Sequence, residues 1–133
     1  MFPATYEINY GASAKEIINT MLKTFDSVYT EEYSARAKEL GMSDYDIITL
    51  ASVIEREAAN ADEHKKVAGV FYNRIKDGMN LQSCATVQYI LKERKSVLLI
   101  KDTEIDSPYN TYKYSGLPGG PVASPSKSAI EAA

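Results

Sequence analysis

The chain has 133 residues, of which 44% are hydrophobic and 25% are charged, and its formal net charge at pH 7 is −3. This balance is typical of a single globular domain and excludes a disordered chain, a collagen-like chain and a disulfide-rich scaffold. No apolar run approaches the ~18 residues that a membrane-spanning helix needs. Acidic residues far outnumber basic ones between residues 26 and 63, which argues against a nucleic-acid-binding surface.

The first half of the chain predicts an extended segment followed by helices. Residues 2–10 are aromatic and β-branched, and they indicate a strand or an extended arm that ends at Gly11. Ser13 and Glu16 form a capping-box pattern, and Ser43 is a further N-cap candidate before a periodic apolar run. We therefore expect helices over residues 14–29, 30–40, 44–59 and 63–77.

The second half of the chain is richer in turn residues. We expect an extended piece at 81–83, a helix over 85–93 and a loop region over 106–125 that contains a hairpin at 110–114. Pro125, placed at the first helical position after Ser124, predicts the start of a final helix that continues to the end of the chain. Together these elements predict one α+β domain over residues 1–133, mainly helical, with a small antiparallel sheet or hairpin.

The third predicted helix carries two carboxyls near its C-terminus. Seen down the helix axis, at about 100° per residue, Ile47, Ala51 and Ile54 form an apolar stripe, and Glu55 lies at its edge. Glu57 falls about 160° away from Glu55. Apolar neighbours and the negative end of the helix dipole both disfavour an ionised carboxyl at Glu55, which makes it a candidate general acid. A solvated or salt-bridged helix residue is the alternative interpretation.

Most glycosidases place two carboxyls across one bond, whereas Glu55 and Glu57 point apart. Asp102, Glu104 and Asp106 precede the loop region, but nothing in the sequence brings them to Glu55. If the protein cleaves glycans, a mechanism with a single carboxylate is therefore favoured.

Other candidate residues have simpler interpretations. His64, the only histidine, is expected on a helix surface rather than at a metal. Cys84 is expected to be a small buried residue rather than a nucleophile. The Gly/Pro run at 116–121 lacks the Lys-Ser/Thr pair of a phosphate loop and indicates a rigid turn. We predict no metal site and no cofactor.

Several segments, taken in order, resemble a known protein family. The segment that contains Glu55, ASVIERE, resembles the ASIIEKE motif of the endolytic murein transglycosylases, also described as YceG-like. Five further segments follow the family's order: FPATY, VAGVFYNR, MNLQS, SPYNTY and the stretch that begins GLP. These motifs cover essentially the whole chain, and their joint occurrence is specific. Cys84 and Gly119 depart from the pattern, because the family usually has Asp and Pro there.

The resemblance implies a bacterial enzyme with a lysozyme-like catalytic core that cuts nascent peptidoglycan strands. Glu55 matches the family's essential glutamate, which would protonate the oxygen between N-acetylmuramic acid (MurNAc) and N-acetylglucosamine (GlcNAc). The same carboxylate would then accept the proton of the MurNAc C6 hydroxyl, leaving a 1,6-anhydro end. From their amide and phenol groups, we expect four residues to line a cleft near Glu55 and bind the polar, uncharged sugars: Asn73, Gln82, Asn110 and Tyr112. The alternative is that Asn110 stabilises a turn and that Asn73 caps a helix.

The resemblance also implies a location and partners. The family's transmembrane anchor, LysM-like module and C-terminal strands are not found here, so we expect a soluble fragment of a single-pass membrane protein with an extracytoplasmic catalytic domain. The implied partners are glycan strands and peptidoglycan synthases. Two alternatives stay open: a non-catalytic glycan-binding or scaffold domain of the cell-wall elongation machinery, and a muramidase that admits water.

Overall fold

The computed structural model describes all 133 residues as helices joined by irregular segments, without any β-strand. The helices in chain order are α1 (Ala14–Val28), α2 (Glu31–Glu39), α3 (Asp44–Glu57), the 3-10 helix η1 (Ala61–Glu63), α4 (His64–Lys76), α5 (Cys84–Leu91), α6 (Ile100–Thr103) and α7 (Lys127–Ala132). The expected α+β class, with its small antiparallel sheet or hairpin, is therefore wrong, whereas the expected helical core is present. None of these helices has both the length and the apolar character to cross a membrane.

The expected hairpin at 110–114 is replaced by a tight turn. The carbonyl of Asn110 accepts hydrogen bonds from the backbone N–H groups of Lys113 and Tyr114, at 3.2 and 3.0 Å. These are local contacts, so the backbone groups of the turn do not pair across two strands. Prolines at 108, 118 and 121 remove further backbone donors from the same region. The loop region therefore packs through side chains and turns instead of a ladder.

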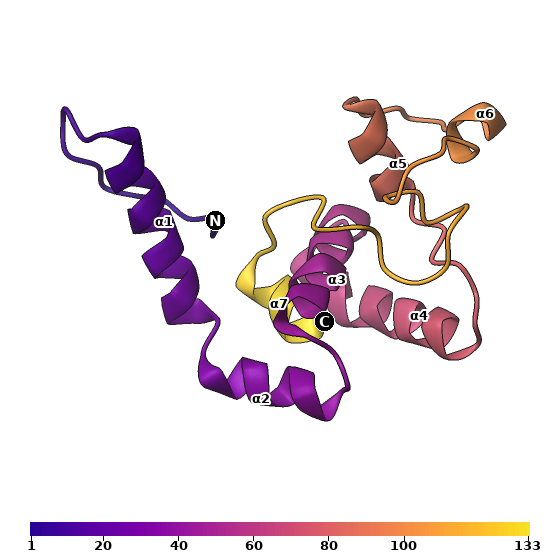
Figure 1. Cartoon of the computed structure of the whole chain (residues 1–133), viewed down its shortest axis with the longest axis horizontal. Helices are drawn as coiled ribbons and strands as arrows, with labels where there is room; N and C mark the ends of the chain where they lie inside the picture. The colour runs from indigo at the N-terminus through magenta and orange to yellow at the C-terminus, as the bar shows by residue number, and fades with distance from the viewer.

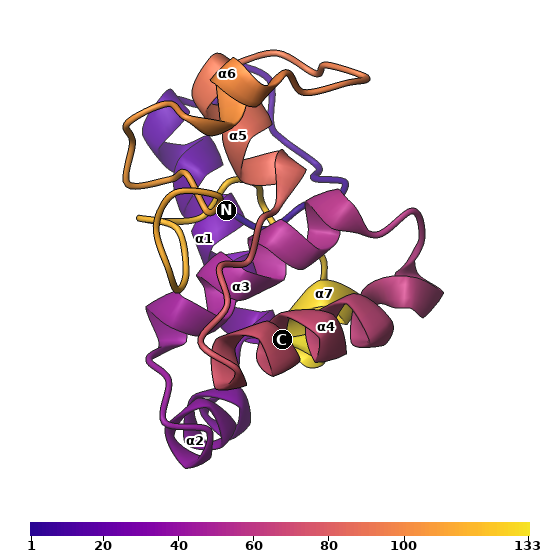
Figure 2. The ribbon, with the colours of Figure 1, turned by 90° about the vertical axis from the view of Figure 1, so that its right-hand side faces the viewer.

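The core is built around the middle of α3. Five consecutive residues of this helix have no solvent exposure at all: Leu50, Ala51, Ser52, Val53 and Ile54. They pack with Ala68 and Phe71 of α4, with Leu81, and with Ala129 and Ile130 of α7. Both views show α3 in the middle of the molecule, with α4 and α7 beside it and α5 and α6 on the side opposite α2 (Figures 1 and 2). A helix buried on all faces needs neighbours on all sides, which explains this arrangement.

Helix α1 and the N-terminal arm stand apart from this core (Figure 1). No residue of α1 is buried, although Phe25 near its end packs against the core. Residues 2–10 form the extended arm that the sequence allowed, without strand pairing, and Phe2 returns to contact the core. The capping box expected at Ser13 is present, and Ser43, expected as an N-cap, also forms a capping box, with Asp46.

The final helix begins later than expected. Its N-cap is Ser126, whose side-chain oxygen accepts a hydrogen bond from the backbone N–H of Ala129 at 3.3 Å. Pro125 therefore precedes the helix instead of occupying its first position. Ala129 and Ile130 are almost fully buried against α3 and α4, so packing stabilises a helix that is too short to persist alone.

The position of Ile54 in the core generates a stability prediction. Ile54→Ala should lower the free energy of unfolding by about 2–5 kcal/mol, because it leaves a cavity inside a close-packed cluster. Urea denaturation followed by circular dichroism measures this loss. The control is Ile18→Ala on α1, where the side chain is 46% exposed and a change within about 0.5 kcal/mol is expected. Equal losses at the two positions would contradict this account of the core.

Candidate functional site

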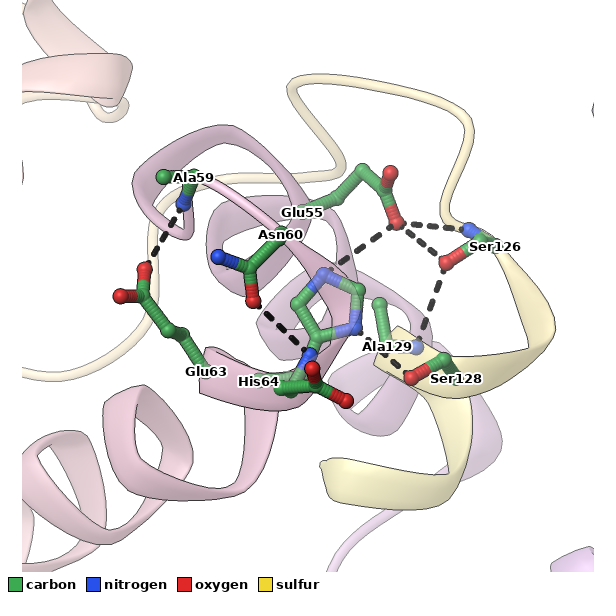
Figure 3. A network of polar contacts seen from close by, with 9 residues as sticks. Glu55, Ala59, Asn60, Glu63, His64, Ser126, Ser128 and Ala129 are labelled. Carbon is green, nitrogen blue, oxygen red and sulfur yellow. Dashed lines mark hydrogen bonds and ion pairs between the residues drawn. The ribbon is translucent and has the colours of Figure 1, made fainter.

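The two carboxyls at the end of α3 reach different neighbours. Glu55, partly buried, faces α7, where its Oε2 accepts hydrogen bonds from the backbone N–H and the hydroxyl of Ser126, at 2.9 and 2.6 Å. Because Ser126 is also the N-cap of α7, Glu55 joins the start of the last helix to the end of α3 (Figure 3). This contact spans 71 positions in the sequence.

His64 completes the network around Glu55, and the expectation that it lies on a helix surface is wrong. Its side chain is only 6% exposed, its Nδ1 is 2.9 Å from the hydroxyl of Ser128, and its Nε2 is 4.0 Å from Oε2 of Glu55. Figure 3 shows the imidazole between the Glu55 carboxyl and the first turn of α7. The contacts of His64 therefore link α3, α4 and α7. The sequence pattern of α4 alone does not predict them, because both partners lie in other helices.

Glu57 turns to the other side of α3, towards α5. Its Oε1 accepts hydrogen bonds from the hydroxyl of Ser83 and, at 3.2 Å, from the backbone N–H of Ala85 in the first turn of α5. An N–H group at a helix N-terminus has no partner within its own helix, so Glu57 satisfies one of these free donors. Its second oxygen, Oε2, accepts no hydrogen bond within the chain, so the side chain is held in place while one oxygen stays available.

Two of the predicted sugar-binding residues lie on the same side as Glu57. Arg74 of α4 donates to Oε1 of Gln82 at 3.3 Å and to the carbonyl of Asn80 at 3.0 Å, and so fixes the segment before α5. The hydroxyl of Tyr112 lies 3.0 Å from Sγ of Cys84, the first residue of α5. Cys84 is exposed, contrary to the expectation that it is buried.

Backbone contacts bring the two segments together. The N–H of Gln82 donates to the carbonyl of Thr111 at 3.0 Å, and the N–H of Ser83 donates to the hydroxyl of Thr111 at the same distance. The side-chain amide of Asn80 donates to the carbonyl of Tyr112 at 2.9 Å. Residues 80–83 and 110–112 therefore form one joined surface next to Glu57, without being paired strands.

Burial raises the pKa of Tyr112 to about 12, and its contact with Cys84 and the charge of Glu57 act in the same direction. The phenol consequently stays protonated at every pH at which the protein is expected to work. It can therefore act as a hydrogen-bond donor to a sugar oxygen, which is the role that its residue type suggested.

The other two predicted residues are not part of this group. Asn110 is fully buried, and its side-chain amide donates to the carbonyls of Thr103 and Ile105, at 2.9 and 2.7 Å. Its Oδ1 accepts from the N–H of Tyr112 at 3.0 Å, so every polar atom of the side chain serves the loop itself. Asn73 is exposed on α4, and its side chain forms no hydrogen bond.

Hollows in the surface adjoin Glu57 on two sides. One, of about 260 Å³, is lined by Glu57, Arg74, Gln82 and Ser83 together with apolar residues of α4. The other, of about 440 Å³, is lined by Glu57, Cys84, Ala85 and residues that follow α5. The largest hollow, about 630 Å³, lies between α2 and α7, is mostly apolar and contains none of the predicted site residues. Polar groups that converge on a recess make the surface at Glu57 the better candidate site.

Sequence reasoning missed Arg74, Ser83 and the position of Glu57 in this group. The signal was present in part, because Arg74 ends the VAGVFYNR segment and Ser83 ends MNLQS. No group of three or more His, Cys, Asp or Glu side chains is arranged to hold a metal ion.

Comparisons with known proteins agree on one family. The YceG-like family model matches residues 1–133. An endolytic murein transglycosylase from Bacillus subtilis is 46% identical over the whole chain, and one from Streptococcus pneumoniae is 41% identical over 98% of it. The chain spans 37% and 24% of the lengths of these relatives. The crystal structure of a YceG-like protein from Listeria monocytogenes superposes with a TM-score of 0.89 at 42% identity, covering 98% of this chain and 43% of that one.

The two asparagines give a matched stability prediction. Asn110→Ala should lower the free energy of unfolding by about 3 kcal/mol, because two carbonyls and one N–H lose their partner inside the loop. Asn73→Ala, on the exposed face of α4, should change it by no more than about 0.5 kcal/mol. Urea denaturation of both variants measures the difference. A loss below about 1 kcal/mol for Asn110→Ala would contradict its structural role.

Proposed function

The chain belongs to the YceG-like family, and we propose that the full-length protein cleaves the MurNAc–GlcNAc bond of nascent peptidoglycan strands as an endolytic lytic transglycosylase, leaving 1,6-anhydroMurNAc ends. The relatives that carry the name endolytic murein transglycosylase support this proposal over the region that they share with the chain. The observation that carries it further is the arrangement of Glu57, whose carboxyl is anchored through one oxygen and open through the other, between two hollows in the surface.

We assign the general acid/base role to Glu57 in preference to Glu55. Glu55 is the sequence-based candidate, but its carboxyl is used to join α3 to α7 and lines neither hollow. Glu57 lies beside Gln82 and close enough to Tyr112 to influence the pKa of the phenol. Two of the residues suited to bind sugars, Gln82 and Tyr112, therefore lie on the side of Glu57, and Glu55 remains the second candidate.

A single carboxyl is sufficient for the proposed reaction. The protonated Glu57 would donate its proton to the glycosidic oxygen, and the bond between that oxygen and C1 of MurNAc would break. The resulting carboxylate would accept the proton of the MurNAc C6 hydroxyl as that oxygen forms the new bond to C1. The acid is thereby regenerated, and water does not enter. The protonated phenol of Tyr112 and the amide of Gln82 are suited to hold the sugar hydroxyls during these steps.

The proposal includes a place of action and partners. Nascent glycan strands are assembled outside the cell membrane, so we propose that the full-length protein works on the extracytoplasmic side, held there by a membrane anchor. Peptidoglycan synthases, which supply the strands, are the proposed protein partners. No cofactor is required by the proposed chemistry.

The assignment is tested by a pair of isosteric substitutions in the full-length protein. Glu57→Gln should reduce the cleavage of purified glycan strands by about 10²–10⁴-fold, the usual contribution of general acid–base catalysis. Glu55→Gln should retain most turnover, with a lowered melting temperature because a contact between α3 and α7 is weakened. Strand cleavage is measured by chromatography of the products.

The opposite outcome, in which only Glu55→Gln abolishes cleavage, would return the catalytic role to Glu55. Mass spectrometry of the wild-type products separates the remaining alternatives. Anhydro-muropeptides support the transglycosylase, reducing-end MurNAc products indicate a muramidase, and uncleaved strands indicate a glycan-binding or scaffold domain.

A further inference from the structure

A basic recess adjoins the candidate site on the side away from Gln82. The hollow of about 440 Å³ beside Glu57 is also lined by Arg56, Gln88 and Arg94. A neighbouring hollow of about 450 Å³ shares these three residues and adds Lys92 and one acidic residue, Glu93, whose carboxylate pairs with Lys95. We call the two together the Arg56–Arg94 recess. It leads from Glu57 along one side of α5.

The two arginines of the recess are without protein partners. Neither Arg56 nor Arg94 has a carboxylate oxygen within 4.0 Å, and neither side chain donates a hydrogen bond within the chain. Lys95, in contrast, is engaged by Glu93 at 3.4 Å and Asp102 at 3.3 Å. Two guanidinium groups therefore stay free in a protein whose net charge is −3. A guanidinium matches a carboxylate through paired hydrogen bonds, which is the partner that such a recess favours.

The residue that follows Arg94 is held by two contacts. The amide of Gln88 donates to the carbonyl of Lys95 at 3.0 Å, and Nζ of Lys95 reaches the buried carboxylate of Asp102. A hydrogen bond from the N–H of Leu99, with the charge of Lys95, keeps the pKa of Asp102 below its usual value, so this anchor stays ionised near neutral pH. The backbone next to Arg94 is therefore tied to α5 and α6, and the exposed side chain of Arg94 can reach a ligand.

We propose that the Arg56–Arg94 recess binds the carboxylates of the stem peptide carried by the MurNAc residue at the cleavage site. This inference rests on the proposed function. The glycan itself is uncharged near the reacting bond, whereas the peptide is attached through the lactyl group of the same MurNAc whose C1 is attacked. A strand whose MurNAc lies at Glu57 brings its peptide carboxylates beside that residue, where the recess begins. The recess thus selects strands that still carry their peptides.

The test measures cleavage by the full-length protein of two substrates: glycan strands with intact stem peptides, and the same strands after an amidase has removed the peptides. Wild type should show a lower KM for the peptide-bearing strands. The double variant Arg56→Gln/Arg94→Gln should raise that KM by about tenfold or more, the usual effect of losing charge-assisted hydrogen bonds. Its kcat, and its KM for peptide-free strands, should stay close to those of wild type.

The matched control is Lys65→Gln/Lys66→Gln, which removes the same charge from exposed positions of α4. It should leave both KM values unchanged. Soluble stem pentapeptide provides an independent measurement, because it should inhibit wild type competitively and inhibit the arginine variant much less. An equal rise in KM for both substrates, an equal effect of the lysine control, or no change at all would overturn the proposal.

Failure of this inference is distinguishable from failure of the proposed function. Full activity of Glu57→Gln would remove the catalytic assignment without altering the difference in KM between the two substrates. If the wild type cleaves strands normally but shows no preference for peptide-bearing strands, the proposed role of the recess in binding peptides is ruled out and the proposed transglycosylase function is unaffected.

Discussion

Burial of the middle of α3, residues 49–54, on every side is the constraint on which the rest of the structure depends. A helical stretch without an exposed face cannot rely on solvent to satisfy its polar side chains, so each is either bonded within the protein or, like the hydroxyl of Thr49, left without a partner. Ser52 shows how this works, because its hydroxyl donates to the carbonyl of Thr49 and accepts from the N–H of Val122, at 2.7 and 2.9 Å. The loop that follows Tyr114 is therefore tied directly to the centre of the core, and α7 is led back onto it.

The two carboxyls in the last turn of α3 are also hydrogen-bonded by segments that pack around this helix. Because Glu55 and Glu57 point to different sides, each meets the start of a different helix: Glu55 contacts Ser126 before α7, and Glu57 contacts the N–H of Ala85 in α5. One carboxyl thus secures the packing of the core, while the other is left at the surface with an open oxygen. A single helix end can in this way supply both a structural joint and a candidate reactive group, two positions apart.

The charged side chains around α5 also differ in burial, and the difference separates those that serve the fold from those that are free to bind a ligand. Asp102 is buried and paired with Lys95, so its charge serves the fold of the segment after α5. Arg56 and Arg94 have no such partner and face solvent across a recess. Net charge alone therefore says little about which ligands this surface favours, since an acidic protein can carry a local basic site beside its candidate carboxyl.

Local features of this protein could be predicted from the sequence, because they depend on neighbours along the chain. These features are the capping box at Ser13, the N-cap at Ser43, the order of the main helices, the angle between Glu55 and Glu57, and the family motifs. The buried position of His64 and the surroundings of each carboxyl could not be predicted in this way, because their partners lie far away in the sequence: Glu55 meets Ser126 across 71 positions and His64 meets Ser128 across 64. Periodicity reports which side of a helix is apolar, but it carries no information on which distant segment covers that side. The packing of α3 among α4, α5 and α7 determines which segments cover it, and therefore which of the two carboxyls keeps an oxygen free of hydrogen bonds.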